Sequence, residues 1–587
     1  MDPQISSSLN AIWAELIVKE MLRNKIDQFV LSPGSRCTPL TAAVAAEKKA
    51  AAIMHFDERG AAYFALGYGR ATGRPAVLVC TSGTAAANYF PAVVEASMDR
   101  VPLIMLTADR PPELLGSGAN QTIDQVNLYS KYVRYHFELP CPDKQIPPES
   151  ILTVVDQAVY RTTRSPRGPV HINCMFREPL VPTQSQKDFS LYLLGVKRWI
   201  NGNKPFTLYG PSIHTIDDSK VEQLAAVINK AQNGLLVIGK LNADSEREAV
   251  RRLSQKLNWP TFADIRSGLR LGVKDSNTIT YFDQLLLADT FQKLNPSVIL
   301  HLGGVMVSKR FQFFIQKNQP EHYIHVSDHP FRHDPDHRIT ARIESDFCWF
   351  CLKLLPLIKT GADNLFLKRF QKADNIAGEI VEMFIADSPA ITEPAVARIV
   401  SKTIPKDSCL FVGNSMPIRD MDMYADPSGP GVKIAANRGA SGIDGNIATA
   451  SGFLHGSRAP GTLVLGDLAC LHDVNSLALL ANISNPLTVV VVNNNGGGIF
   501  SFLPVSECRE IFEPFFATPH NLTFEKVAET FRLEYYQPRS KKAFIQDYQK
   551  AINTNRSTVI EVRTDRDENL TFHRLLQDKI KTNIDNL

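Results

Sequence analysis

Short apolar runs that end in polar or glycine-rich turns recur along the whole chain, and stretches with helical periodicity separate them. Such runs are typical of buried parallel strands, and the periodic stretches between them are typical of crossover helices. The predicted strands are 29–31, 76–80, 101–106, 169–173, 234–239, 297–302, 323–326, 409–412, 463–465, 489–492 and 559–562. Helices are predicted at 13–22 and 393–400. The pattern therefore predicts an α/β protein of doubly wound parallel sheets.

The length of the chain predicts more than one hydrophobic core. A chain of 587 residues exceeds what one core sustains, so we expect three α/β domains of about 170 to 200 residues each. We predict them at residues 1–185, 205–360 and 388–587, with a polar, proline-containing connector between the first two. The glycine-containing strand ends of the central domain do not complete GxGxxG, so dinucleotide binding there is unsupported.

Composition and charge exclude several classes of protein. Hydrophobic residues make up 44% and charged residues 21% of the chain, as in a soluble globular protein. The net charge of +4 is too small to indicate a nucleic-acid surface. No apolar stretch approaches the roughly 18 residues of a membrane span, and the start lacks the regions of a signal peptide. We therefore expect a cytoplasmic protein without nucleic-acid or membrane partners.

Cysteines and histidines do not form a convincing metal or redox motif. The nine cysteines are scattered, which favours reduced thiols. Cys348 and Cys351 form a CxxC, but the surrounding pattern predicts a buried helix, so a redox or zinc role is disfavoured. A histidine-rich stretch between 322 and 337 combines a strand with turn residues, and its spacing does not support a metal site.

Two polar residues, Asp467 and Asn494, each follow an apolar run that predicts a strand. A helical pattern at 473–480 lies between them, so strand, helix and strand form one right-handed unit. Both side chains then lie at the carboxyl ends of neighbouring strands, where open α/β sheets bind ligands. Carboxylate and amide oxygens, together with the carbonyl of Gly496, suit Mg²⁺, and a diphosphate can supply further oxygens.

An alternative is that these residues form only a strand-end turn and a polar loop. Against this, residues 493–498 comprise three asparagines and three glycines after four valines, which suits a backbone that must approach an ion closely. The arrangement resembles the metal and diphosphate motif of thiamine diphosphate enzymes. Leu468 departs from that pattern, since most of the family has a second glycine there, and this puts the local turn in doubt.

Glu58 is the candidate for the second half of such a site. It begins a predicted helix rich in small residues. The resemblance implies that Glu58 is catalytic and binds the cofactor, because a carboxylic acid on the aminopyrimidine ring favours the reactive tautomer of thiamine diphosphate. The alternative is a capping carboxylate at a helix N-terminus. In this superfamily the glutamate domain of one subunit faces the diphosphate domain of another, which implies a homodimer or a dimer of dimers.

Further segments resemble one family more closely, the 2-succinyl-5-enolpyruvyl-6-hydroxy-3-cyclohexene-1-carboxylate synthases. These segments are 32–36, 56–60, 107–114, 118–121, 413–415, 437–445 and 493–500. The resemblance implies pyrimidine-binding, central and diphosphate-binding domains, with thiamine diphosphate and Mg²⁺ or Mn²⁺ as cofactors. It also implies decarboxylation of 2-oxoglutarate and 1,4-addition of the succinyl unit to isochorismate, in menaquinone or phylloquinone biosynthesis.

The resemblance also implies roles for individual residues. The residues implied to contact substrate are Ser35, Arg36, Arg110, Asn120, Gln121, Lys309, Ser415, Arg419, Arg438, Phe500 and Leu503. Those implied to contact the cofactor are Glu58, Ser415, Ile443, Asp467, Asn494, Gly496 and Ile499. Physical chemistry supports the arginines separately, because two dicarboxylate substrates need several fixed cations. The alternative for each arginine is an ordinary surface ion pair.

Other functions remain compatible with the same motifs. A 2-oxo acid decarboxylase or an acetohydroxyacid synthase would use the same cofactor, although the adjacent histidines of pyruvate-type decarboxylases are absent from the sequence. A non-catalytic metabolite sensor could share the fold, since fold does not determine function. The combination of Glu58, Asp467 and Asn494 argues against the sensor.

Overall fold

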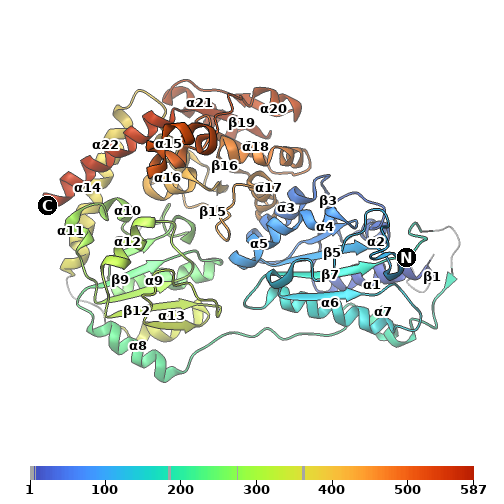
Figure 1. Cartoon of the computed structure of the whole chain (residues 1–587). Helices are drawn as coiled ribbons and strands as arrows, with labels where there is room; N and C mark the ends of the chain where they lie inside the picture. The colour runs from blue at the N-terminus through green and yellow to red at the C-terminus, as the bar shows by residue number, and fades with distance from the viewer. Residues whose placement is uncertain (1–4, 7, 183–186, 274, 360–363) are drawn as a thin grey trace. The chain divides into compact units, whose positions relative to one another are not determined.

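The computed structural model describes residues 5–6, 8–182, 187–273, 275–359 and 364–587. The chain divides into two compact units (Figure 1). Unit 1 comprises residues 1–212, 437–459 and 472–485, and unit 2 comprises residues 213–436, 460–471 and 486–587. Unit 1 contains a six-stranded parallel sheet, and unit 2 contains a five-stranded and a six-stranded parallel sheet. Three parallel sheets confirm the predicted fold class, while the predicted domain limits stay a prediction.

The main sheet of unit 1 is covered by helices on both faces. Its strands run in the order β3 (Ala51–Met54), β2 (Gln28–Leu31), β4 (Val77–Cys80), β5 (Leu103–Asp109), β7 (Pro169–Met175) and β6 (Tyr135–Leu139). Successive residues of a strand point to opposite faces, so Phe29 and Val30 of β2 belong to different hydrophobic cores. One core includes α1 (Leu9–Arg23), α2 (Thr38–Ala46) and α6 (Pro148–Thr163); the other includes α3 (Glu58–Thr72) and α5 (Phe90–Asp99).

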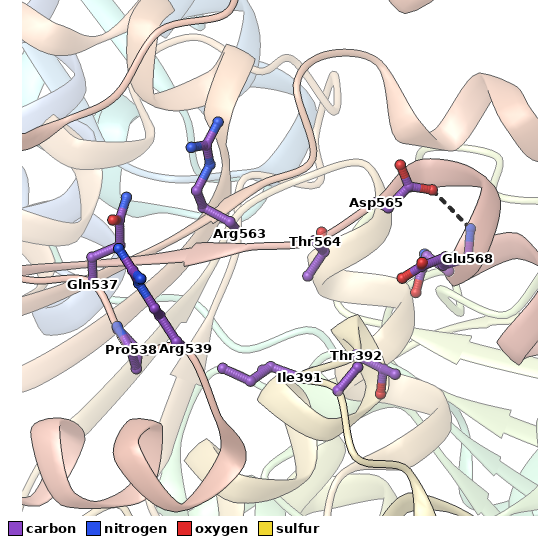
Figure 2. A pocket seen from close by; sticks show the side chains of 11 residues that line it. Ile391, Thr392, Gln537, Pro538, Arg539, Arg563, Thr564, Asp565 and Glu568 are labelled. Carbon is purple, nitrogen blue, oxygen red and sulfur yellow. Dashed lines mark hydrogen bonds between the residues drawn. The ribbon is translucent and has the colours of Figure 1, made fainter.

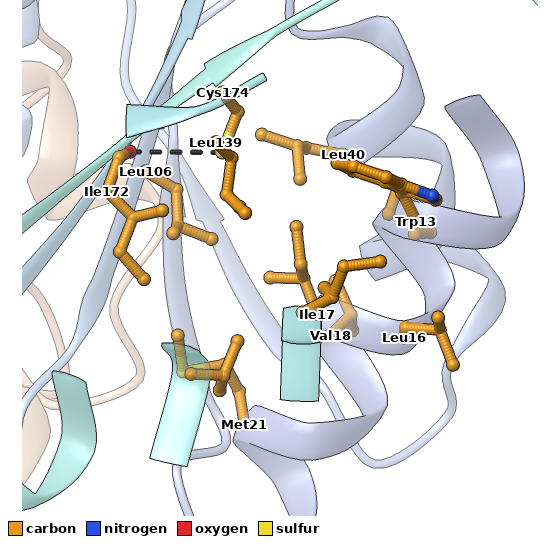
Figure 3. Packing of buried hydrophobic residues seen from close by; sticks show 14 of the residues in the cluster. Trp13, Leu16, Ile17, Val18, Met21, Leu40, Leu106, Leu139, Ile172 and Cys174 are labelled. Carbon is orange, nitrogen blue, oxygen red and sulfur yellow. Dashed lines mark hydrogen bonds between the residues drawn. The ribbon is translucent and has the colours of Figure 1, made fainter. Parts of the chain in front are cut away.

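Helix α1 shows how the sequence pattern produces this packing. Ser8 caps the helix by accepting a hydrogen bond from the backbone N–H of Ala11. Trp13, Ile17 and Met21 recur every four residues and therefore share one face. Figure 3 shows these side chains directed toward the apolar residues of β5, β6 and β7. The predicted helix at 13–22 is thus confirmed and is longer at its N-terminal end.

Helix α17 (Asn446–Ser457) packs directly against α3 within unit 1 (Figure 1). The two backbones approach so closely that side chains larger than hydrogen do not fit at the crossing. A Cβ added to Gly67 would lie 2.0 Å from the carbonyl oxygen of Thr449. One added to Gly452 would lie 1.9 Å from the carbonyl oxygen of Phe64. These glycines therefore determine how α3, the helix that begins with Glu58, is held.

Unit 2 contains the remaining two sheets. The central sheet has the order β10 (Thr261–Ala263), β9 (Gly234–Ile238), β11 (Val298–Leu302), β12 (His322–Ser327) and β13 (Ala341–Glu344). The third sheet has the order β15 (Lys433–Ala435), β14 (Cys409–Val412), β16 (Gly461–Gly466), β17 (Leu487–Asn493), β19 (Thr558–Arg563) and β18 (Glu534–Tyr536). Two long helices, α14 (Leu365–Asp387) and α22 (Arg566–Asp585), share a core with the central sheet.

The connection between β16 and β17 differs from the prediction. The strands are neighbours and parallel, as expected. In place of the α-helix predicted at 473–480, the structure has a 3₁₀-helix, η6 (Val474–Ala481). A short α-helix, α18 (Asp467–His472), precedes it. Asp473 interrupts the connection because its carboxylate accepts hydrogen bonds from the backbone N–H groups of Ile447 and Ala448, at 2.7 and 3.0 Å. The carboxylate thereby caps α17.

The CxxC segment and the start of the histidine-rich stretch, for which a metal or redox role was considered, form a helix and a strand. Cys348 and Cys351 lie in the helix α13 (Phe347–Leu354), as predicted, and both thiols are free. His322 and His325 lie in β12, again as predicted. Among the helices that the structure describes, none is long and apolar enough to cross a membrane.

Candidate active site

The candidate residues fall into two sets, one in each unit. Unit 1 carries Ser35, Arg36, Glu58, Arg110, Asn120, Gln121, Arg438 and Ile443. Unit 2 carries Lys309, Ser415, Arg419, Asp467, Asn494, Gly496, Ile499, Phe500 and Leu503. Each set is described within its own unit.

Arg36 and Arg110 are buried cations beside two strand ends of unit 1. Arg36 is 7% exposed and Arg110 is 9% exposed. The guanidinium of Arg36 donates to the carbonyl of Phe176 at 2.8 Å and lies 3.3 Å from the carboxylate of Glu178. Burial and the neighbouring Arg110 lower the pKa of Arg36. Two cations held this close together and largely out of water suit a carboxylate ligand.

The loop at 116–121 supports Arg110 from the other side. Arg110 donates to the carbonyl of Asn120 at 3.1 Å. Gln121 has a left-handed backbone, with φ of 57°, and its carbonyl accepts from the Ser82 hydroxyl at 3.0 Å. The structure thus gathers Arg36, Arg110, Asn120 and Gln121 at one edge of the sheet. The side chains of Ser35, Asn120 and Gln121 are exposed there.

Gln125 joins these loops and was missed by the sequence analysis. It is fully buried. Its side-chain oxygen accepts from the backbone N–H of Gly83 at 2.8 Å, and its nitrogen donates to the Asn173 side chain at 2.8 Å. A buried amide with both ends satisfied makes a rigid support. No local pattern marks it, because its partners are distant in sequence, one at the start of α4 (Thr84–Asn88) and one on β7.

Glu58 and Asp57 divide the start of α3 between them. Asp57 is the N-cap, and its carboxylate accepts from the backbone N–H groups of Arg59 and Gly60 at 3.0 and 3.4 Å. The capping role that was the alternative for Glu58 therefore belongs to its neighbour. Burial raises the pKa of Glu58, and the charge of Asp57 adds to the rise. Such a carboxyl group keeps its proton to higher pH than an exposed glutamate does.

The loop that carries Arg438 is anchored by Glu95 of α5. Both carboxylate oxygens of Glu95 accept backbone hydrogen bonds, from Gly439 at 2.8 Å and from Ala440 at 2.6 Å. Glu95 also pairs with Arg70 at 3.2 Å, and both side chains are buried. Ile443 follows in the same loop and is 37% exposed. Glu95 was not predicted from the sequence.

In unit 2, Asp467 begins α18 at the end of β16 and is 1% exposed. Its Oδ2 accepts from the backbone N–H of Gly496 at 2.9 Å and lies 3.1 Å from Nε2 of His520. Its Oδ1 accepts from the backbone N–H of Leu468 at 2.6 Å. Burial raises the pKa of Asp467, whereas the bonds from Gly496 and His520 oppose the rise. His520 is a further partner that the sequence analysis missed.

Asn494 is the residue that best fits a metal ligand. Its side-chain nitrogen donates to Glu393 at 2.8 Å. Its side-chain oxygen is buried and has no hydrogen-bond partner among the described residues. An unpaired buried acceptor is costly unless a ligand satisfies it. A hard cation beside the Asp467 carboxylate would do so.

Gly496 brings the backbone close to these two side chains. Its φ of 132° is strained for any other residue, and an added Cβ would lie 1.9 Å from the carbonyl oxygen of Ala517. The Gly496 carbonyl accepts from the N–H of Gly498 at 2.9 Å, which leaves its second lone pair for a cation. The donor set of Asp467, Asn494 and Gly496 therefore fits a Mg²⁺ or Mn²⁺ ion.

The remaining candidates of unit 2 lie on three different elements. Ser415 has φ of 73° and precedes α16 (Met416–Tyr424), and Arg419 donates back to its carbonyl. Ile499 and Phe500 lie in the 3₁₀-helix η7 (Gly498–Phe502), and Leu503, 42% exposed, follows it. Lys309 begins α12 (Lys309–Lys317), and its ammonium lies over the ring of Phe313 at 5.4 Å. Its predicted role stays a prediction.

Comparison with protein families gives three consecutive matches. The N-terminal TPP binding domain of thiamine pyrophosphate enzymes matches residues 13–128. The middle domain of thiamine pyrophosphate enzymes matches residues 190–412. The C-terminal TPP binding domain matches residues 428–562.

Curated relatives of the chain share one name, 2-succinyl-5-enolpyruvyl-6-hydroxy-3-cyclohexene-1-carboxylate synthase. The chain is 47% identical to that of Rubrobacter xylanophilus over 568 residues, which cover 97% of this chain and 98% of the relative. It is 41% identical to that of Salinibacter ruber over 573 residues, covering 97% of this chain and 96% of the relative. It is 43% identical to that of Chlorobium phaeobacteroides over 588 residues, covering 99% of both chains.

Proposed function

The chain belongs to the 2-succinyl-5-enolpyruvyl-6-hydroxy-3-cyclohexene-1-carboxylate synthase family of thiamine diphosphate-dependent enzymes, and we propose that it joins 2-oxoglutarate to isochorismate. In this reaction 2-oxoglutarate loses CO₂, and the remaining succinyl unit adds to the alkene of isochorismate. The product would be 2-succinyl-5-enolpyruvyl-6-hydroxy-3-cyclohexene-1-carboxylate, after which the related synthases are named. We further propose that it serves menaquinone or phylloquinone biosynthesis.

The buried pair of Arg36 and Arg110 is the observation that carries the choice of substrates. Both substrates are dicarboxylates, and binding them away from water requires fixed cations. The guanidinium of Arg110 donates to the carbonyl of Asn120 and interacts electrostatically with the adjacent Asp109, and we propose that it binds a ligand carboxylate. Arg419 and Arg438 are proposed to hold further carboxylates, with Ser35, Asn120, Gln121, Ser415 and Lys309 as polar contacts.

The chain's residues are proposed to prepare the cofactor as follows. Bound thiamine diphosphate supplies the electron sink for loss of CO₂. Asp467, Asn494 and Gly496 would hold Mg²⁺ or Mn²⁺ and, with it, the diphosphate. Glu58 would keep a proton at the aminopyrimidine ring nitrogen. Ile443 would support the cofactor, and Ile499, Phe500 and Leu503 would exclude water from the reacting carbon. A homodimer or dimer of dimers remains part of the proposal.

The decisive experiment measures CO₂ release from 2-oxoglutarate with thiamine diphosphate and Mg²⁺, in the presence and absence of isochorismate. We expect release that depends on isochorismate and yields the joined product in equal amount. Rapid release without isochorismate would instead indicate a 2-oxo acid decarboxylase. A complete lack of turnover with both substrates would favour a non-catalytic role.

A further inference from the structure

Glu393 is a buried carboxyl group to which the proposed chemistry assigns no role. It is the first residue of α15 (Glu393–Thr403) and is 4% exposed. Its Oε1 accepts from the Asn494 side-chain nitrogen at 2.8 Å and from the Thr564 hydroxyl at 3.3 Å. No cation pairs with it within the described part of the chain. Burying a carboxyl group costs free energy, so its presence requires a reason.

Capping of α15 does not supply that reason. Thr392 is the N-cap, and its hydroxyl accepts from the backbone N–H of Ala395 at 3.3 Å. Thr392 and Thr564 also line a surface pocket of about 460 Å³, in which Figure 2 labels both. Glu393 itself is not among the lining residues. The side-chain hydrogen bonds of its carboxyl group are therefore those with Asn494 and Thr564.

The contact with Asn494 determines which atom of that side chain is available. An asparagine side chain has an oxygen and a nitrogen of similar size, and only the oxygen binds a cation. Oε1 of Glu393 accepts from both the Asn494 nitrogen and the Thr564 hydroxyl, so the NH₂ group of the amide faces Glu393. The Asn494 oxygen consequently points the other way, where it is buried without a partner.

We propose that Glu393 is a positioning residue that orients Asn494 for metal binding. This inference rests on the proposed metal site of Asp467, Asn494 and Gly496. Groups behind the direct ligands orient them in many metal sites, and their loss commonly weakens metal affinity by about 10- to 100-fold. Thr564 is the weaker, supporting contact, because its distance to Glu393 is longer.

The test measures Mn²⁺ binding in the presence of thiamine diphosphate, from the electron paramagnetic resonance signal of free Mn²⁺. Glu393→Met keeps the volume but removes the acceptor, and we expect it to weaken Mn²⁺ affinity by about 10- to 100-fold. Glu393→Gln keeps an acceptor oxygen and should bind Mn²⁺ more tightly than Glu393→Met. Equal losses in the two variants would overturn the hydrogen-bond explanation.

The matched control is Glu568→Met. Glu568 is exposed and lines the pocket beside Thr392 and Thr564; its side chain has no hydrogen bond to Asn494, so its variant should bind Mn²⁺ like the wild type. Circular dichroism and thermal melting of each variant without cofactor establish that it is folded. Unchanged Mn²⁺ affinity in folded Glu393→Met would also overturn the proposal.

A second measurement separates orientation from a merely structural effect. In an Asn494→Asp background the ligand has two equivalent oxygens and needs no orientation, so adding Glu393→Met should no longer weaken Mn²⁺ binding. The same loss in both backgrounds would contradict positioning. Asp467→Ala with Asn494→Ala tests the underlying site. If that double variant binds Mn²⁺ normally, the metal site is wrong; if it loses binding while Glu393→Met does not, only the positioning role fails.

Discussion

Two adjacent carboxyl groups at the start of α3 have different surroundings. Asp57 satisfies two of the free N–H groups of the helix, which leaves the half-buried carboxyl of Glu58 available for another role. The sequence alone could not assign the two roles, because either carboxylate is close enough to the helix N-terminus to cap it.

Replacing Glu58 by Gln should abolish most turnover without preventing cofactor binding. Proton transfer by a positioned group commonly contributes about 10²- to 10⁴-fold to rate, so we expect a loss of kcat in that range. Single-turnover kinetics at saturating thiamine diphosphate provide the measurement. Asp57→Ser keeps a capping oxygen and serves as the control, with most activity retained. Wild-type turnover in Glu58→Gln would show that the assigned proton role is wrong.

Glu58→Gln should also change how the stability of the protein depends on pH, and it should stabilise the protein at higher pH. Because burial raises the pKa of Glu58, the folded state binds this proton more tightly than the unfolded state does. The group's stabilising contribution is therefore present below the unfolded pKa and is lost as pH rises through the folded pKa. Without cofactor, Glu58→Gln should gain Tm relative to the wild type as pH rises above the ordinary glutamate pKa of about 4.3. Parallel pH profiles of Tm would contradict this.

The arginine pair predicts selective effects on substrate binding. Arg36→Ala and Arg110→Ala should each raise KM for at least one substrate by about 10- to 100-fold, since a hydrogen bond to a charged group contributes about 1.5–3 kcal/mol. Steady-state kinetics with each substrate varied in turn provide the values. Arg177→Ala is the control, because Arg177 forms an exposed ion pair with Glu113. Unchanged KM values in both test variants would defeat the dicarboxylate argument.

Among the secondary-structure elements, prediction from sequence succeeded in the centre of each sheet and failed at its edges. Every inner strand of the three large sheets was predicted. The strands missed are β3, β6, β10, β13, β15 and β18, which are the edge strands. Residues Ala51, Ala52 and Met54 of β3 are exposed, and β10 and β15 span only three residues each. Most edge strands are short or carry polar residues, as β13 and β18 do, whereas β3 is apolar throughout but mostly exposed.

The crossing of α3 and α17 predicts a large stability effect from one methyl group. Gly67→Ala would place a Cβ against the Thr449 carbonyl, and such overpacking commonly costs about 1–3 kcal/mol. We expect a lower Tm by scanning calorimetry and weaker activity, because α3 carries Glu58. Gly210→Ala is the control, since nothing lies within 4 Å of its added Cβ. Equal Tm values for the two variants would refute the close-packing argument.

For the whole molecule, removal of the divalent metal should abolish turnover reversibly. A chelator should eliminate coupled CO₂ release, and added Mg²⁺ or Mn²⁺ should restore it. A ligand at 100 times its Kd stabilises the folded state by about 2.7 kcal/mol, so thiamine diphosphate with Mg²⁺ should also raise Tm. Asp467→Ala should lose both effects. Full turnover in excess chelator would show that the metal is unnecessary.

The amino-acid pattern alone specified the α/β class, the inner strands and the loops bearing the proposed ligands, because apolar runs and glycine-rich turns are local properties. Family resemblance added the proposed substrates. The partners of those ligands emerged only in the folded chain: Glu393 meets Asn494 across 101 residues, and Glu95 meets Gly439 across 344. The type of a residue does not predict which distant residue its side chain will contact. Chain topology brings such groups together, and only there do burial and hydrogen bonding give Glu393, Glu95, Gln125 and His520 their roles.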